Sequence, residues 1–569
     1  MTTIEERRAA VARRHPTWVR RTVSGHFAAL AAGYPDRPLV MTDDRTWTYA
    51  EMVRWARDLA KGLMALGLAR GDHVAVVMAN HPELVALRLG IAFAGGVSVP
   101  INTMLKRDEL GYLLRQSDSV LLVTMDGFRD GDYLTMLDEL GPGWEADPAR
   151  LSPALRQVVV FDGAGRVGDR AVTRFSELVE LGRSVSDADL DQRHGEVSPD
   201  DLVDIVYTSG TTGLPKGVML THDNVLRCSF TACLARAMED GRRLVFALPM
   251  YHNYAHIEGF MAMSWVAGAV VPQLQFDPLA TLQAIEKFQV NEPLFVPTMT
   301  LAVLEHPRFA EFDLGSLTAV MSAAAPAPVT LWEEICRAFG VTEVTTAYGQ
   351  TELASSAAYK RPEDPLVLLT ETVGRLKPRS VAGSPELDGR VAEYRTIDPV
   401  TLEFLPDGQE GEFVARGPER MRGYYNKPEE TEAVFLPGGW MRTGDLGYIR
   451  ADGNLALTGR SKELYKCGGE LVAPKEIEEL LTARSDVSQA YVVGIPDVRM
   501  GEVGCAYVVP APGATWTPEE LIEFCRERLA RFKVPRHVVA IRVDELPTTA
   551  TGKIQKFVLA ERAKTASLV

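Results

Sequence analysis

Hydrophobic and polar residues alternate with two different periods along this chain, and the periods predict its helices and strands. From 48 to 66, apolar residues recur every three or four positions, and Thr48 forms a capping box with Glu51. A second helical pattern spans 82–96. Continuous apolar runs, typical of strands buried on both faces, occur at 73–80, 97–101, 202–207, 243–249, 292–297 and 317–322. Because strands and helices alternate, the pattern predicts an α/β fold of mostly parallel sheets covered by helices.

The pattern changes character after about Arg460. Strand-like runs at 490–496, 505–511 and 537–543 surround a helical segment at 517–532. That helix has a capping box between Thr517 and Glu520 and a proline at its first position. The last hundred or so residues therefore predict a separate, small α+β domain, which the polar segment 459–464 joins to the rest.

Composition narrows the classes of function and partner. The chain has 569 residues, which suggests two to four domains, and its net charge of −15 disfavours binding to nucleic acid or anionic membranes. Six scattered cysteines without a C-x-x-C pair indicate a reducing compartment, and no apolar run is long enough to cross a membrane. A cytoplasmic protein is expected. The basic segment 1–21 predicts a solvated helix face in preference to a membrane-surface helix.

A loop rich in glycine and hydroxyl groups, YTSGTTGLPKG at 207–217, directly follows one of the predicted buried strands. Glycines allow the backbone to approach an anion, bare N–H groups surround it, and Lys216 adds a positive charge. This chemistry suits a polyphosphate at the carboxyl edge of a sheet. The loop is not a Walker A motif, because Pro215 and Gly217 flank the lysine. By composition alone, a mobile surface loop is an equal alternative.

Together with four further segments, this loop resembles the signature motifs of the adenylate-forming superfamily of acyl-CoA synthetases, peptide-synthetase adenylation domains and beetle luciferases. The further segments are AYGQTE (347–352), RTGDLG (442–447), GRSKELYKCGGELVAPKEIEE (459–479) and LPTTATGKIQK (546–556). The resemblance extends from about Trp47 to Lys556. It implies a large N-terminal domain at 1–459 that includes a smaller β subdomain, a hinge at 460–463, and a small mobile C-terminal domain at 464–569.

The resemblance also implies a reaction. A carboxylate attacks the α-phosphorus of ATP to give acyl-AMP and pyrophosphate, and a thiol then displaces AMP; ATP, Mg²⁺ and coenzyme A are the implied cofactors. Lys553, Glu352 and Thr351 are the implied catalytic residues, and Thr211 and Glu352 the metal-binding ones. The implied ATP and AMP contacts are Thr208, Ser209, Gly210, Thr211, Thr212, Gly213, Lys216, Ala347, Tyr348, Gly349, Gln350, Asp445 and Arg460.

The second half-reaction depends on the C-terminal segment. By resemblance, Lys462 is the hinge, and the small domain turns to present Lys466, Gly468 and Gly469 to the pantetheine arm of coenzyme A. Relatives often carry Gln or Arg where Leu471 stands. Because leucine cannot hydrogen-bond to an adenylate, either another group substitutes or the thioester step is slower.

The acyl pocket implied by the resemblance is apolar. Its expected lining is His252, Tyr254, Ile257, Phe260, Met261, Val296, Pro297, Ala323, Ala324 and Ala325. No aspartate stands in 250–256 to hold an α-amine, so a bulky hydrophobic carboxylic acid is the expected substrate. His252 and His256 have the spacing of zinc ligands, but a glutamate and a third ligand are missing and zinc is not expected.

Alternatives remain for the acceptor and for the class of protein. The thiol belongs either to coenzyme A or to an acyl carrier protein, and a luciferase-like oxidation is less favoured. A non-catalytic nucleotide-binding sensor is the alternative of a different class, which the presence of Lys553, Glu352 and Asp445 disfavours. The oligomeric state, the pathway and the identity of the acid are not predicted.

Overall fold

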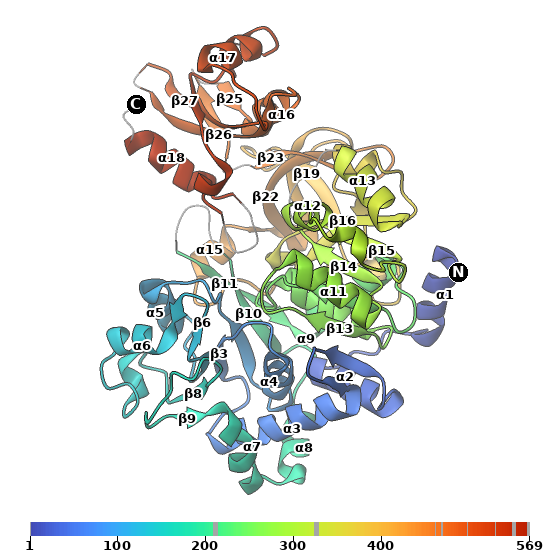
Figure 1. Ribbon diagram of the computed structural model, residues 1–569, viewed down its shortest axis with the longest axis vertical. Helices are drawn as coiled ribbons and strands as arrows, with labels where there is room; N and C mark the ends of the chain where they lie inside the picture. Colours follow the sequence, from blue (N-terminus) through green and yellow to red (C-terminus); the bar gives the residue numbers. More distant parts are fainter. Residues whose placement is uncertain are drawn as a thin grey trace. The chain divides into compact units, whose positions relative to one another are not determined.

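The computed structural model describes residues 2–208, 214–323, 329–460, 463–467, 470–497, 499–529, 531–548 and 554–565. These residues form two compact units (Figure 1). The large unit contains the described residues up to 393 together with 416–439. The small unit contains 394–415 and the described residues from 440 onward.

A nine-stranded sheet forms one half of the large unit. Its inner strands run parallel, and antiparallel strands complete both edges. In spatial order the strands are β18 (Arg375–Leu376), β17 (Ser356–Lys360), β16 (Glu343–Gly349), β15 (Ala319–Ser322), β14 (Glu292–Phe295), β12 (Arg243–Phe246), β13 (Ala269–Pro272), β1 (Pro38–Met41) and β2 (Thr46–Thr48).

A seven-stranded sheet forms the other half of the large unit. Its strands are parallel except for the antiparallel edge strand β11, which returns from β10. In spatial order the strands are β11 (Lys216–Thr221), β10 (Leu202–Thr208), β4 (Val97–Pro100), β3 (His73–Val77), β5 (Leu121–Met125), β8 (Gln157–Phe161) and β9 (Thr173–Arg174).

Helices cover these sheets, as the alternating pattern predicts. Helix α3 (Tyr49–Ala65) begins at the capping box of Thr48 and Glu51, and it packs on α4 (Pro82–Phe93), whose residues are almost all buried. Other helices of the large unit include α1 (Ile4–Arg14), α2 (Val23–Gly33), α5 (Arg107–Gln116), α6 (Tyr133–Leu140), α8 (Asp187–Gly195), α9 (His222–Ala235), α11 (Pro278–Phe288), α12 (Pro297–Leu304) and α13 (Val329–Phe339). The prediction of an α/β fold with parallel sheets is confirmed.

The small unit contains two sheets. One includes β19 (Glu393–Ile397), β20 (Gly411–Arg416), β22 (Trp440–Ile449) and β23 (Leu455–Arg460). The other consists of β24 (Tyr465–Cys467), β25 (Glu470–Val472), β26 (Val487–Asp497), β27 (Gly501–Pro510) and β28 (His537–Ala540), with helices α16 (Pro474–Thr482), α17 (Pro518–Arg526) and α18 (Lys556–Thr565) around a shared apolar core. The capping box at Thr517 forms, and the helix ends at Arg526 instead of near residue 532.

The boundary of the small unit differs from the division expected at 460. The sheet of β19, β20, β22 and β23 lies in the same compact unit as the C-terminal α+β region. Expected hinge residue Lys462 lies outside the described residues, so a hinge at 460–463 remains a prediction.

The basic N-terminal segment is held by carboxylates of the large unit. On α1, Arg7 is 7% exposed and forms ion pairs with Glu239 and Glu343, while Arg8 pairs with Glu363 at 2.8 Å. Arg7 and Val11 are the buried residues of α1, whereas Arg13 and Arg14 are exposed, in agreement with the expected solvated helix face. Every helix among the described residues is too short or too polar to cross a membrane.

Two histidines with lowered pKa values, the buried His222 and the partly exposed His252, predict that the fold loses stability in mild acid. Burial lowers the pKa of His222 to about 3 and that of His252 to about 4, while the Val23 N–H donates to His222 Nδ1 at 3.1 Å. The same histidines in the unfolded chain take up a proton near pH 6.5. Stability should therefore fall as the pH drops below 6.5 and continue to fall until about pH 4, by about 1.4 kcal/mol per pH unit for each histidine.

Thermal unfolding measured between about pH 7 and pH 5 tests this expectation. We expect the Tm to drop through this range, and His222→Asn, which keeps an acceptor for Val23 but does not titrate, to give a shallower drop. A Tm that is flat or rises toward pH 5 would contradict the burial of neutral histidines.

Candidate active site

The expected adenine and acyl residues gather at one edge of the nine-stranded sheet. Val296 and Pro297 follow β14, Ala323 follows β15, and Tyr348 and Gly349 end β16. These three strands are parallel neighbours, so their carboxyl ends meet at the same edge, which is where α/β sheets bind ligands. The sequence motifs are thereby brought together although they lie about fifty residues apart.

Position 349 must be glycine because the backbone at this position lies very close to the backbone of Ser355 and Ser356. A Cβ atom at this position would lie 2.0 Å from the carbonyl oxygen of Ser355, so no other residue fits. The chain then turns through a short 3-10 helix, η6 (Thr351–Leu353), which carries Thr351 and Glu352, and Ala354 adopts a left-handed φ of +63°. Of the same motif, Ala347 lies within β16, and Gln350 precedes η6.

The turn at Thr351 and Glu352 is anchored from behind by the segment that carries the expected acyl residues. The Asn253 side chain donates to the carbonyl of Ala354, and Glu258 accepts from the Ser356 N–H at 3.0 Å and from the Tyr359 hydroxyl. Asn253 and Glu258 are both buried, so water does not compete for these bonds. The carboxylate expected to bind metal therefore stands on a rigid support.

Glu352 also contacts the phosphate-loop strand through a tyrosine. The Tyr424 hydroxyl donates to Glu352 Oε1 at 2.8 Å, and Lys216 Nζ lies 4.8 Å from the centre of the Tyr424 ring. Burial and the Glu352 carboxylate raise the pKa of Tyr424 well above its usual value, so the phenol keeps its proton. Tyr424 thus joins Lys216 to Glu352.

The backbone around Tyr424 explains this placement. Residues 421–425 run beside β11: Met219 N–H donates to Gly423 O at 3.0 Å, and Tyr425 N–H donates to Gly217 O at 2.8 Å. Met421 N–H donates to Glu352 O at 2.8 Å. The segment is therefore fixed to both motifs. Thr208 and Lys216 face each other across β10 and β11, whereas Ser209, Gly210, Thr211, Thr212 and Gly213 lie outside the described residues.

The chemistry of Glu352 fits Mg²⁺. It is a partly exposed carboxylate, and among the described residues its Oε2 accepts no hydrogen bond and is left for a hard cation. Within the described ranges, no three His, Cys, Asp or Glu side chains form a complete metal cage. A Mg²⁺ ion that binds mainly to phosphates and water requires only a single carboxylate from the protein.

The expected acyl residues lie on an unusual helix. Residues Tyr254–Met261 form a π-helix, η4, which packs on α9 and is connected to β14 by a hydrogen bond of 3.0 Å from the Tyr254 hydroxyl to Phe295 O. Ile257, Phe260 and Met261 are fully or almost fully buried, whereas His252 and Tyr254 are partly exposed. Such helices often mark functional sites. Ala324 and Ala325 lie outside the described residues.

The small unit places the two expected ribose residues opposite each other. Asp445 on β22 is 3% exposed and pairs with Arg460 in the antiparallel ladder of β22 and β23. Lys466 on β24 pairs with Leu471 on β25. Cys467 is buried in the apolar core, and burial raises its pKa, which makes it a structural residue. Lys553, Lys462, Gly468 and Gly469 lie outside the described residues.

Comparison with known proteins identifies the family. The family model of the AMP-binding enzymes matches residues 27–425, and the model of the AMP-binding enzyme C-terminal domain matches residues 476–553. The chain belongs to the AMP-binding enzyme family.

Relatives of this AMP-binding enzyme match it over nearly their whole length. A methyl-dioxo-octahydro-indenyl propanoyl:CoA ligase of Mycobacterium tuberculosis is 34% identical and covers 95% of this chain and 99% of its own. A long-chain-fatty-acid–CoA ligase of Bacillus subtilis is 31% identical, with coverages of 95% and 94%. ATP-bound MatB from Rhodopseudomonas palustris is structurally similar, with a TM-score of 0.77, 28% identity and coverages of 95% and 99%.

These matches establish the class of reaction. The protein is an acyl-CoA ligase: it activates a carboxylic acid with ATP to an acyl-adenylate, and it transfers the acyl group to coenzyme A. The resemblance to adenylate-forming enzymes, the fold class and the enzymatic activity expected from the sequence are all confirmed.

Tyr424 was missed by the sequence reasoning. Its segment, RGYYNKPEET at 422–431, contains two tyrosines and a proline that begins a short helix, α15 (Pro428–Glu432), but no charge or glycine pattern typical of phosphate binding. Its role depends on contacts with residues about seventy and two hundred positions away. Only the structure shows them.

Removing the Tyr424 hydroxyl should weaken the use of metal and ATP. In Tyr424→Phe the ring below Lys216 remains, but Glu352 loses one charge-assisted hydrogen bond, which is worth about 1.5–3 kcal/mol. We expect the concentration of Mg²⁺ that gives half-maximal acyl-AMP formation to rise about tenfold or more, while the KM for the acid changes little.

Tyr425→Phe is the matched control, since its hydroxyl bonds to the exposed Asp118 at 3.1 Å. Calorimetric titration of each variant with Mg²⁺ and ATP gives a second readout that is independent of turnover. Equal Mg²⁺ dependence of Tyr424→Phe and wild type would show that the hydroxyl does not position Glu352.

Proposed function

We propose that this ligase acts on a bulky, hydrophobic carboxylic acid, with Mg²⁺-bound ATP as the donor of AMP and coenzyme A as the acceptor. The observation that carries the proposal is the apolar character of the expected acyl residues. Ile257, Phe260 and Met261 on η4, together with Val296 and Ala323 at the carboxyl edge of the sheet, present no charge that would select a polar acid. His252 adds none, because its lowered pKa keeps it neutral.

The named relatives support this range of substrates. One acts, by its name, on a propanoyl group that carries a bicyclic octahydro-indene, and another on long-chain fatty acids. By these names, the first acid carries a bicyclic ring system with two oxo groups and the second a long hydrocarbon chain. Both names specify coenzyme A as acceptor, which favours coenzyme A over a carrier protein here.

The first half-reaction requires charge to be stabilised at the α-phosphate. In this proposal Lys216 and the glycine-rich loop bind the departing pyrophosphate, and Thr351 donates to the α-phosphate. Tyr348 offers its ring to adenine, and Asp445 accepts from ribose hydroxyls. A Mg²⁺ ion held by Glu352 would neutralise phosphate charge. Lys553 bridges the carboxylate and the α-phosphate, where negative charge develops.

A screen of acids tests the proposal. Purified protein, ATP and Mg²⁺ are incubated with single acids, from acetic acid to long-chain and alicyclic acids, and pyrophosphate release is measured with and without coenzyme A. We expect the highest kcat/KM with bulky hydrophobic acids, and consumption of coenzyme A in proportion to pyrophosphate. A preference for short or charged acids would contradict the assignment, and pyrophosphate release without loss of coenzyme A would point to a carrier protein.

A further inference from the structure

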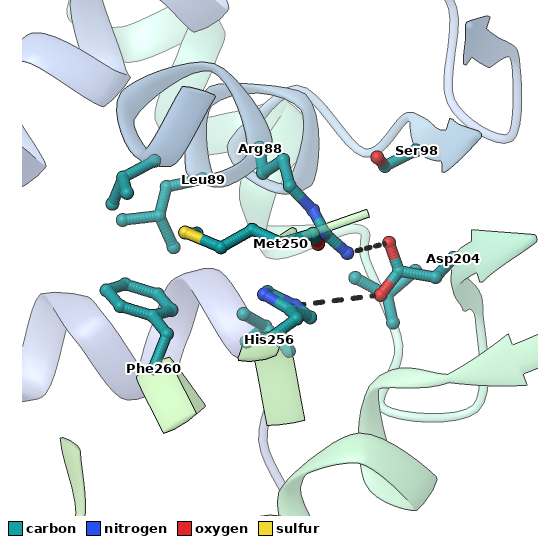
Figure 2. A pocket seen from close by; sticks show the side chains of 10 residues that line it. Arg88, Leu89, Ser98, Asp204, Met250, His256 and Phe260 are labelled. Atoms are coloured by element: carbon teal, nitrogen blue, oxygen red, sulfur yellow. Dashed lines mark hydrogen bonds and ion pairs between the residues drawn. The ribbon is translucent and has the colours of Figure 1, made fainter. Parts of the chain in front are cut away.

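A small cavity with a few polar side chains in a mainly apolar lining lies between η4, β10, β4 and α4. Figure 2 shows Arg88 from α4 and His256 from η4 directed toward Asp204 on β10, with Ser98 of β4 nearby. The rest of the lining is apolar and includes Phe260, one of the residues expected in the acyl pocket. The space is about the size of one water molecule.

Three buried polar atoms of this cavity have no hydrogen-bond partner among the described residues. They are Ser98 Oγ, Asp204 Oδ2 and His256 Nδ1, and each side chain is at least nine-tenths buried. Buried polar atoms are normally paired, because an unpaired one costs about 1–3 kcal/mol. All three belong to residues that line this one cavity, so a polar group bound there is the candidate partner for them.

The charges of the lining side chains determine which kind of polar group can bind in the cavity. Arg88 donates to Asp204 Oδ1 at 2.6 Å and to Met250 O at 2.8 Å, which compensates the charge of the aspartate. Asp204 Oδ2 lies 3.9 Å from His256 Nε2, too far for a direct hydrogen bond. Burial and the charge of Arg88 lower the pKa of His256 well below its usual value, so the ring is neutral.

A neutral group that both donates and accepts a hydrogen bond matches these atoms. The carboxylate oxygen Asp204 Oδ2 can only accept a hydrogen bond, whereas Ser98 Oγ can donate or accept one. A second cation is disfavoured because Arg88 is adjacent, and an anion is disfavoured by Asp204. A carbonyl cannot donate to Asp204. A hydroxyl satisfies the aspartate and accepts from Ser98.

The cavity lies along the same face of η4 as the expected mouth of the acyl pocket. His252, His256 and Phe260 follow one another at intervals of four residues, and the His256 and Phe260 rings stack with centroids 6.1 Å apart. Of the three, His252 is partly exposed and the other two are buried.

We propose that Ser98, Asp204 and His256 form a subsite of the acyl pocket that binds a hydroxyl group on the distal part of the acid. The inference rests on the proposed function, because it adds one polar feature to an otherwise hydrophobic substrate. It also assigns Arg88 as the residue that positions Asp204. The preferred acid is then a hydroxylated one, whose hydroxyl takes the place of a buried water.

Matched pairs of acids provide the test. The kcat/KM for pyrophosphate release is measured with ω-hydroxy fatty acids from hexanoic to dodecanoic acid and with the unsubstituted acid of each length. A hydroxyl normally weakens binding in an apolar pocket. We expect one chain length at which the hydroxy acid is favoured about tenfold or more, because a buried acceptor gains its missing donor.

The failures of the two proposals are distinguishable. If the unsubstituted hydrophobic acids react and every hydroxy acid is used less well than its parent, the subsite is refuted while the proposed function stands. If no acid of either series and no alicyclic acid releases pyrophosphate, both fail; if only alicyclic acids react, the subsite for a hydroxyl on an acyl chain is refuted while the proposed function stands.

Ser98→Ala removes one partner with little risk to folding, since Ser98 Oγ holds no other group in place. We expect this variant to lose most of the preference for the hydroxy acid. Ser152→Ala is the matched control, because Ser152 is equally buried but donates to Leu114 O at 3.2 Å outside this cavity. If Ser98→Ala retains the wild-type Tm and the full preference, the hydroxyl is bound elsewhere and the proposed subsite is wrong.

Discussion

Lys553→Ala should abolish most acyl-AMP formation and leave thioester formation nearly intact. By the proposed roles, its ammonium meets the negative charge that develops between carboxylate and α-phosphate in a site with little water. Removing one such preorganised donor lowers kcat by about 10²–10³. The second half-reaction develops no charge at that position, and the proposed turn of the small domain carries the lysine away. The two half-reactions should therefore respond differently.

Single-turnover measurements separate the two steps. Acid and MgATP report the first, and presynthesised acyl-AMP with coenzyme A reports the second. Lys564→Ala, in which an exposed lysine on α18 loses its ion pair with Glu561, is the matched control and should affect neither step. An equal slowing of both steps by Lys553→Ala would show that the lysine is structural or acts in both states, and the turning of the small domain would lose its support.

Glu292→Gln should destabilise the large unit by about 3 kcal/mol or more. Glu292 begins β14, and its two carboxylate oxygens pair with Arg236 at 2.8 Å and with Arg242 at 2.7 Å. All three side chains are fully buried. Burial alone would raise the pKa of Glu292, but the two guanidinium groups outweigh it and hold the pKa below its usual value. The amide keeps the shape and leaves two buried cations without their shared anion.

Urea-induced unfolding gives the measurement. Glu334→Gln is the control, because Glu334 pairs with Arg337 on the exposed face of α13 and its loss should not change stability measurably. A wild-type unfolding midpoint for Glu292→Gln would mean that the buried triad contributes nothing that the amide cannot replace. The strand that Glu292 begins leads to Val296 and Pro297, so a destabilised variant should also lose affinity for the acid.

Local sequence patterns predicted many of the helices and strands, because capping and hydrophobic periodicity depend only on residues that are close together in the chain. The capping boxes at Thr48 and Thr517 form as expected, and the apolar runs at 73–80 and 202–207 become β3 and β10. The order of the motifs was enough to recognise the family. Strand order, in contrast, depends on which runs pair across long stretches of chain, and no single run contains that information.

The sequence predicted site residues whose motif reveals their chemistry. It did not predict residues whose role depends on contacts with distant parts of the chain. Glu352 is conspicuous in AYGQTE, but its supports Glu258 and Tyr424 come from segments about seventy to a hundred residues away. His256 shows the same limit. Its spacing from His252 is that of zinc ligands, yet its position on a π-helix places it against Asp204 in a neutral, buried cavity. Tertiary contacts gave these residues their roles.

The division into units was also beyond local reasoning. The segment 459–464 is polar and reads as a linker, but β22 and β23 form ten- and six-residue strands that pair up to Arg460. Long-range pairing of β20 with β22 then places 394–415 in the small unit. A boundary set by tertiary contacts cannot be read from a composition change alone.

The fate of ATP tests the central claim most directly. Protein, MgATP and a hydrophobic acid are incubated with and without coenzyme A, and the products are separated by liquid chromatography with mass detection. We expect equal amounts of AMP, pyrophosphate and acyl-CoA when coenzyme A is present, and enzyme-bound acyl-AMP when it is absent. Formation of ADP and phosphate, or acyl-CoA without any acyl-AMP in the reaction that lacks coenzyme A, would contradict an adenylate-forming ligase.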